Sequence, residues 1–152
     1  MSNPLKERWF EDYTVGEIFE FGDYLVTEKE IIGFASCYDP QPFHTDPAAA
    51  ESSSFNGLIA SGWMTAAIVM KLLCDHFIPA VSAMGSPGID RLRWLLPVRP
   101  GDRLRVRLTV LDASRSRNNP HRGTITLREE ALNQNGKVVM SFEGRALYRC
   151  RT

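Results

Sequence analysis

Cysteine is scarce in this chain. Only Cys37, Cys74 and Cys150 occur among its 152 residues, and they lie far apart. An odd number of widely spaced cysteines argues against a disulfide framework, and the spacing matches no zinc-binding motif. His76 and His121 also stand away from any cluster of cysteines or carboxylates, so we expect no metal site. Free thiols fit a reducing compartment, and we expect the protein in the cytoplasm.

The sequence has no long apolar run either. Residues 1–11 are polar and contain no apolar segment of the kind that secretory signal peptides carry. The most apolar stretch, residues 58–70, is shorter than the roughly 20 residues that a membrane-spanning helix needs. We therefore expect neither a membrane segment nor a membrane partner.

Net charge is also lacking, because 18 basic and 18 acidic side chains cancel. The two signs are spread unevenly: residues 91–152 hold 14 of the lysines and arginines but only 5 of the acidic residues. A basic half of this kind can indicate a nucleic-acid partner. Here, however, Arg103, Arg105 and Arg107 alternate with apolar residues, which is the pattern of the solvent face of a β-strand. We therefore expect no nucleic-acid partner.

What remains is the composition of an ordinary globular domain, with 43% hydrophobic and 24% charged residues. The length predicts a single domain over residues 1–152. Periodicity predicts strands at 17–25, 89–96, 103–112, 123–133 and 137–148, and helices at 27–37, 47–53 and 58–77. This order of elements is that of an α+β fold with an antiparallel sheet. Such a sheet has an open edge, so we expect a homodimer or a larger assembly.

The segment from Asp39 to His44 is the most informative part of the chain. It reads Asp-Pro-Gln-Pro-Phe-His, and its two prolines fix backbone angles and oppose regular structure. We therefore expect a stiff, irregular loop that presents one carboxylate and one imidazole. Such a pair suits acid–base catalysis, because a carboxylate takes a proton from water while an imidazole gives or positions another. The alternative is a plain turn, in which His44 hydrogen-bonds only to the backbone.

Two features further along the chain favour the catalytic interpretation. Asp46 followed by Pro47 has the pattern of a helix N-terminus, so the loop ends at a firm anchor. Gly62 lies near the start of the helix predicted at 58–77, where open backbone N–H groups suit an oxyanion or a polarised carbonyl. The alternative for Gly62 is that its missing side chain lets another element pack closely.

These residues resemble the signature of the MaoC-like dehydratases, a family that includes the (R)-specific enoyl-CoA hydratases. The resemblance is carried by FASCYDPQPFHTDP at residues 34–47, by residues 57–70 and by LLPVRPGD at residues 95–102. It extends over a core of residues 10–148. The sequence departs from the usual family pattern at Tyr38, Gln41 and Ser61, where glycine, asparagine and histidine are frequent.

The resemblance implies a hot-dog fold, in which a curved antiparallel β-sheet wraps a long central helix. It also implies a hydro-lyase that adds water reversibly to a 2-enoyl-CoA, with Asp39 and His44 as the acid–base pair. The Gly62 N–H would bind the thioester carbonyl. We expect Gln41 and Phe43, within the same signature, to contact the substrate. Coenzyme A is part of this substrate, so we expect no separate cofactor.

Three arginines are further candidates for substrate binding. Arg115, Arg117 and Arg122 cluster in a predicted loop that also contains two asparagines and a proline. Guanidinium groups suit the phosphates of coenzyme A. The alternative is an ordinary solvated loop.

Two other functions stay open at this point. A hot-dog thioesterase would also use a carboxylate, but it would hydrolyse the acyl-CoA and release free thiol. A binding module would hold the acyl thioester without turning it over. Free-thiol release distinguishes the first, and tight binding without product identifies the second.

Overall fold

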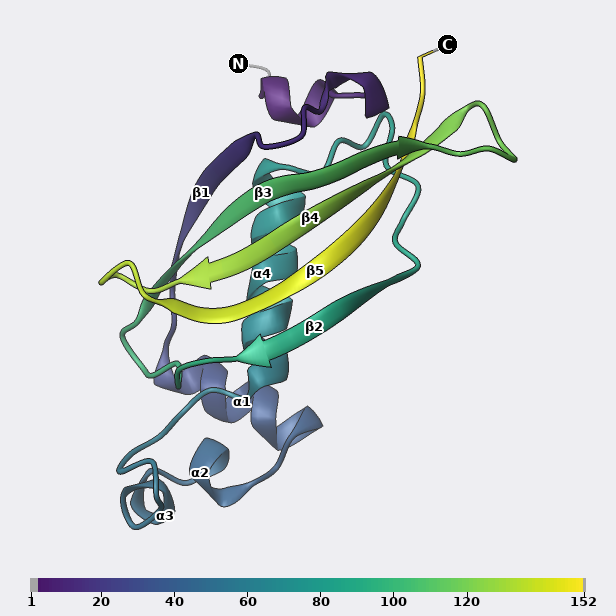
Figure 1. The fold of residues 1–152 in the computed structure, drawn as a ribbon. Coiled ribbons are helices and arrows are strands. Elements are labelled where there is room, and N and C mark those ends of the chain that lie inside the picture. Colours follow the sequence, from purple (N-terminus) through teal and green to yellow (C-terminus); the bar gives the residue numbers. More distant parts are fainter. Residues whose placement is uncertain (1–2, 152) are drawn as a thin grey trace.

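The chain folds as a curved five-stranded antiparallel sheet around one long helix (Figure 1). The computed structural model describes residues 3–151. The strands lie in the order β1-β3-β4-β5-β2, and all neighbouring pairs are antiparallel. Their bounds are β1 Ile18–Leu25, β2 Gly88–Trp94, β3 Arg103–Arg115, β4 Arg122–Leu132 and β5 Val138–Arg149. The predicted α+β class and the wrapped central helix are confirmed.

The hydrophobic core lies between the concave face of the sheet and helix α4, Gly62–His76. Strand alternation sends every second side chain of the sheet to this face. The arginines that alternate with the core residues of β3 point outward and pair with acids on neighbouring strands. Arg107, for example, lies 2.9 Å from the carboxylate of Glu130 on β4. The interpretation of these arginines as the solvent face of a strand is therefore confirmed.

Helix α4 begins at Gly62 rather than at the predicted residue 58. Residues 58–61 are extended instead, because they pair with a neighbouring segment: the Ile59 N–H donates to the Phe43 carbonyl at 3.2 Å. An apolar run does not by itself distinguish a buried extended segment from a helical turn, which explains the error. With 15 residues, α4 is the longest helix described. Within residues 3–151, none of the helices has both the length and the hydropathy of a membrane-spanning segment.

Three short helices gather at the N-terminal end of α4 (Figure 1). They are α1 Glu28–Tyr38, α2 Pro42–Thr45 and α3 Pro47–Glu51. The prediction of an irregular loop was wrong for α2, because Pro42 sits at a first helical position, where a missing N–H costs nothing. The predicted cap of α3 is confirmed, since the Asp46 carboxylate accepts hydrogen bonds from the first turn at 3.0 and 3.3 Å.

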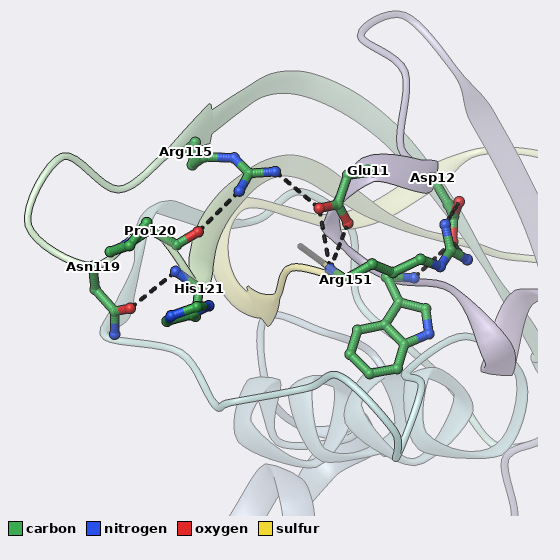
Figure 2. A network of polar contacts seen from close by, with 8 residues as sticks. Glu11, Asp12, Arg115, Asn119, Pro120, His121 and Arg151 are labelled. Atoms are coloured by element: carbon green, nitrogen blue, oxygen red, sulfur yellow. Dashed lines mark hydrogen bonds and ion pairs between the residues drawn. The ribbon is translucent and has the colours of Figure 1, made fainter.

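The residues after β5 pack against the N-terminal segment at the opposite end of the sheet, where short 3-10 turns lie at Pro4–Glu7 and Phe10–Asp12 (Figure 1). The Arg151 guanidinium donates to the Asp12 carboxylate at 2.6 and 2.7 Å. The Arg151 N–H donates to both oxygens of Glu11, at 3.1 Å each (Figure 2). These contacts hold the last strand against the N-terminal turns.

Candidate active site

Asp39 lies where the backbone leaves helix α1. It is the C-cap residue, and its N–H still donates to the Ala35 carbonyl at 2.9 Å. Pro40 follows, and the Gln41 N–H donates back to the Asp39 carbonyl at 2.7 Å. The end of a helix, a proline and a tight turn thus fix the backbone that carries the carboxylate. This agrees with the stiff presentation that the sequence predicts.

His44 is held by a hydrogen bond on one side of its ring. Its side chain is 6% exposed, and Nδ1 lies 2.7 Å from the carbonyl oxygen of Ile59. Because a carbonyl only accepts hydrogen bonds, Nδ1 carries the proton in this contact. The other nitrogen, Nε2, therefore faces the Asp39 carboxylate, 3.2 Å from Oδ2. The extended segment before α4 thus fixes the orientation of the imidazole.

The carboxylate of Asp39 receives more than one hydrogen bond. Gln41 Nε2 donates to Oδ1 at 2.6 Å. This bond, followed by one from the Ser61 hydroxyl and by the proximity of His44, holds the pKa of Asp39 below its usual value against the opposing effect of burial. The group is therefore ionised at neutral pH and can accept a proton from a bound water.

Ser61 is a site residue that sequence reasoning missed. It is fully buried, and its Oγ accepts a hydrogen bond from the Trp63 N–H at 3.3 Å, which caps α4. Its hydroxyl also contacts Asp39. A serine directly before Gly62 at a helix start is a typical N-cap. That signal was overlooked because the helix was expected to begin at residue 58.

Gly62 is the first residue of α4, so its N–H has no partner within the helix. A Cβ added there would overlap the indole ring of Trp94, which crosses the glycine. Trp94 in turn meets Trp63 edge-on, with ring centroids 5.1 Å apart. The close-packing interpretation of Gly62 is therefore confirmed. It is compatible with the other interpretation, because close packing leaves the N–H in place.

All of these groups except Ser61 line one pocket of about 430 Å³, which lies between the α1–α3 region and the N-terminus of α4. Five of the eight residues that the sequence marks as site residues contribute to its wall. They are Asp39, Gln41, Phe43, His44 and Gly62. The end of β2 and the segment after it supply an apolar wall, from Trp94 to Val98. The pocket thus combines a carboxylate and an imidazole with an apolar wall.

The remaining three predicted residues lie elsewhere. The prediction that all three lie in a loop was wrong, because Arg115 ends β3 and Arg122 begins β4, and only Arg117 lies in the loop between them. This β3–β4 hairpin is at the end of the sheet where Arg151 packs against the N-terminal turns (Figure 1). Arg115 pairs with Glu11 at 2.9 Å and donates to the Pro120 carbonyl at 2.9 Å. None of the three lines the pocket at Asp39. Their binding to coenzyme A phosphates stays a prediction.

In the described part of the chain, no three His, Cys, Asp or Glu side chains are grouped so that they could hold a metal ion.

Comparison with known proteins gives a consistent result. Residues 12–132 match the family model described as a MaoC like domain. The chain is 33% identical to the uncharacterized protein YdeM of Bacillus subtilis, over 88% of this chain and 92% of that protein. It is 31% identical to the mesaconyl-CoA hydratase of Cereibacter sphaeroides, over 89% of this chain but only 39% of the hydratase.

Solved structures agree with this assignment. The crystal structure of a MaoC-like dehydratase from Rhodospirillum rubrum superposes with a TM-score of 0.89 at 40% identity, over 95% of this chain and 99% of the other. The R-hydratase PhaJ1 from Pseudomonas aeruginosa superposes with a TM-score of 0.70 at 25% identity, over 95% of this chain and 90% of the other.

Proposed function

The chain belongs to the MaoC-like dehydratase family, and we propose that it is a hydro-lyase that adds water reversibly to a 2-enoyl-CoA. The observation that carries the proposal is the Asp39–His44 pair. Asp39 Oδ2 and His44 Nε2 lie 3.2 Å apart, in a pocket that Gly62 also lines. Relatives named as a mesaconyl-CoA hydratase and an R-hydratase support the reaction class.

The two side chains divide the proton transfers between them. Asp39 accepts a proton from water as the water oxygen bonds to the β-carbon and the C=C π bond breaks. In the proposed step His44 enters with a proton on each ring nitrogen: it gives the Nε2 proton to the α-carbon, while the Nδ1 proton stays bound to the Ile59 carbonyl. The proton on Asp39 then passes to His44 across the 3.2 Å contact, which restores both groups. Acid–base steps of this kind each contribute about 10²–10⁴-fold in rate.

The Gly62 N–H is the proposed donor to the thioester oxygen. Negative charge builds on that oxygen when the β-carbon is attacked, and the positive end of the α4 dipole favours it. The Trp94 indole that covers Gly62 leaves no space for a side chain there. A donor of this type is typically worth about 10²–10³-fold in kcat.

A second cavity offers room for the acyl chain. It has a volume of about 290 Å³ and follows α4 onward from Ala66 to Phe77, beneath β5. The first pocket contacts the same helix from Gly62 to Thr65, so the two cavities use consecutive turns of α4. We call the second one the acyl cavity. In this proposal the thioester lies at Asp39 and the acyl chain extends into the acyl cavity.

A second copy of the chain is the proposed partner at the β2 edge. Strand β2 is the last strand of the sheet and pairs only with β5 among the described strands. Apolar side chains near this edge are exposed, with Trp63 at 57% and Leu95 at 52%. Burying them against a symmetry-related edge removes both the open strand and the apolar surface. Light scattering on the purified protein tests this, and a monomer at micromolar concentration would contradict it.

One assay separates the proposed hydratase from its rivals. A short 2-enoyl-CoA is mixed with the protein, and the loss of conjugated thioester absorbance is followed beside a free-thiol reagent. Loss of absorbance without thiol, abolished in Asp39→Asn, is the expected result. Thiol release would identify a thioesterase instead. Tight binding with neither change would identify a binding module.

A further inference from the structure

Glu129 is a carboxyl group inside the core. It lies on β4, and strand alternation turns it to the concave face together with Leu127 and Ala131. It is 7% exposed. Its register neighbours on the adjacent strands, Leu108 of β3 and Phe142 of β5, are also buried. Glutamate is seldom buried in this way unless it has a partner.

One oxygen of this carboxyl has no hydrogen-bond partner among the described residues. Its Oε2 atom is buried and makes no hydrogen bond with any of residues 3–151. Burial alone raises the pKa of Glu129 to about 8. The group is therefore mostly neutral at pH 7, with one O–H donor and one carbonyl acceptor available. An unsatisfied polar group of this kind destabilises the fold, so its presence calls for a functional explanation.

The sheet leaves space around the carboxyl. Gly144 on β5 stands opposite Leu127, diagonally across from Glu129. A Cβ on Gly144 would overlap the Glu129 carboxyl group. Glycine at this position of β5 therefore lets the carboxyl extend along the sheet instead of being covered by a neighbouring side chain.

This space belongs to the acyl cavity, which Glu129 and Gly144 both line. The walls that α4 contributes are apolar: Ala66, Met70, Leu73 and Phe77. Two charged side chains line the cavity, Glu129 and Arg145. The Arg145 guanidinium pairs with the Asp90 carboxylate at 3.2 Å, outside the core. Glu129 is thus the one carboxyl among the residues that line this cavity, and the other polar lining side chains are Ser86, Arg145 and Tyr148.

We infer that Glu129 is a specificity-determining residue that hydrogen-bonds a hydroxyl group on the acyl chain, at a position remote from the thioester. The substrates that fit best are then hydroxylated acyl thioesters rather than plain hydrocarbon ones. This inference rests on the proposed function, because it assumes that the acyl chain occupies the acyl cavity.

A hydroxyl matches this site better than a charged group does. It offers one donor and one acceptor, which complement those of a neutral carboxyl. A carboxylate or an ammonium group would have to leave water for a chamber with apolar walls, which is far more costly than moving a hydroxyl. A plain alkyl end would offer Glu129 no hydrogen-bond partner.

Binding of unreactive ligands tests the inference. The ligands are saturated acyl-CoAs from butanoyl to octanoyl, each compared with its ω-hydroxylated and ω-carboxylated counterpart by titration calorimetry. We expect the protein to prefer the hydroxylated ligand about tenfold over the plain one at one chain length, as one net hydrogen bond predicts. The Glu129→Leu variant should lose this preference, and Glu129→Gln should keep most of it.

A control variant on the same strand is available. Glu130 points to the opposite face and pairs with Arg107, so Glu130→Gln should leave the preference unchanged. Thermal unfolding checks that Glu129→Leu folds, and replacing an unpaired buried polar group by an apolar one of similar size usually does not destabilise. Equal binding of plain and hydroxylated ligands at all lengths, an unchanged preference in Glu129→Leu, or tighter binding of the carboxylated ligands would each overturn the inference.

Failure of the inference is distinguishable from failure of the proposed function. Hydration of 2-enoyl-CoAs without any hydroxyl preference in binding would overturn the role of Glu129 alone. A Glu129-dependent hydroxyl preference without hydration would overturn the proposed reaction and keep the binding site. Absence of binding to every acyl-CoA would overturn both.

Discussion

The imidazole of His44 is held between Ile59 and Asp39: Nδ1 lies 2.7 Å from the Ile59 carbonyl oxygen and Nε2 lies 3.2 Å from Asp39 Oδ2. The first contact assigns a proton to Nδ1, because a carbonyl cannot donate. It also orients the second nitrogen toward the carboxylate. A backbone carbonyl from the segment before α4 thereby sets which nitrogen faces Asp39.

The first prediction concerns this contact. His44→Ala should lower kcat/KM by about 10²–10⁴-fold, because one acid–base group is lost. It should also lower the free energy of unfolding by about 1–3 kcal/mol, because the Ile59 carbonyl loses its donor in a buried place. Enoyl-CoA hydration and urea unfolding measure the two effects. Wild-type turnover by this variant would remove His44 from the mechanism.

The second prediction uses the amide that binds Asp39. The Gln41 side chain lies 2.6 Å from Oδ1 and is the largest cause of the lowered pKa of Asp39. Gln41→Leu should raise that pKa, so the acid limb of the pH profile of kcat/KM should move to higher pH. Gln134→Leu is a matched control, because Gln134 donates to Asp102 at 3.0 Å and does not line the pocket at Asp39. An acid limb that stays in place in Gln41→Leu would contradict the role of the amide.

The third prediction concerns the approach of Trp94 to Gly62. Gly62→Ala should destabilise the protein by about 1–3 kcal/mol, because the added methyl group overlaps the indole ring. Trp94→Ala in the same chain should relieve this overlap. A double-mutant cycle measured by unfolding should then give a coupling energy of about 1 kcal/mol or more. Additive effects would show that the two residues do not restrict each other.

The fourth prediction follows from the buried carboxyl. Burial raises the pKa of Glu129 to about 8, from an ordinary 4.5. At a pH between these two values, Glu129 is ionised in the unfolded chain but still protonated in the folded chain. The free energy of unfolding therefore falls as pH rises through this window, by at most about 1.4 kcal/mol per pH unit from this group, and levels off above it.

Glu129→Gln should remove this contribution from the pH dependence of urea unfolding. Glu130→Gln is the control, because Glu130 is paired with Arg107 on the outer face. The same slope in wild-type protein and Glu129→Gln would mean that Glu129 ionises normally in the folded state.

Local signals in the sequence were sufficient for much of the fold. Asp46 before a proline predicted the start of α3, because capping depends on neighbours in the chain. The alternation of Arg103, Arg105 and Arg107 with apolar residues predicted the outer face of β3, because strand periodicity is also a local pattern in the chain. The clustering of Asp39, His44 and Gly62 came from the family resemblance, and the structure brings all three to one pocket.

Other features depend on contacts between distant segments, which a single sequence does not specify. Residues 58–61 are extended because the Phe43 carbonyl accepts a hydrogen bond from Ile59. Arg115 contacts Glu11 because the residues after β5 pack against the N-terminal segment beside the β3–β4 hairpin (Figure 2). The burial of Glu129 is different, because the sequence alternation did indicate it and this indication was not used. It stands between Leu127 and Ala131 in the inward phase of β4, where a charged residue breaks the alternation.

The most direct test of the central claim uses water labelled with heavy oxygen. Wild-type protein and Asp39→Asn are incubated with a short 2-enoyl-CoA in this water, and the products are read by mass spectrometry. We expect one labelled oxygen on the β-carbon of an intact 3-hydroxyacyl-CoA, formed by the wild type and not by Asp39→Asn. Label in a free carboxylic acid, or equal labelling of the thioester by both proteins, would contradict it.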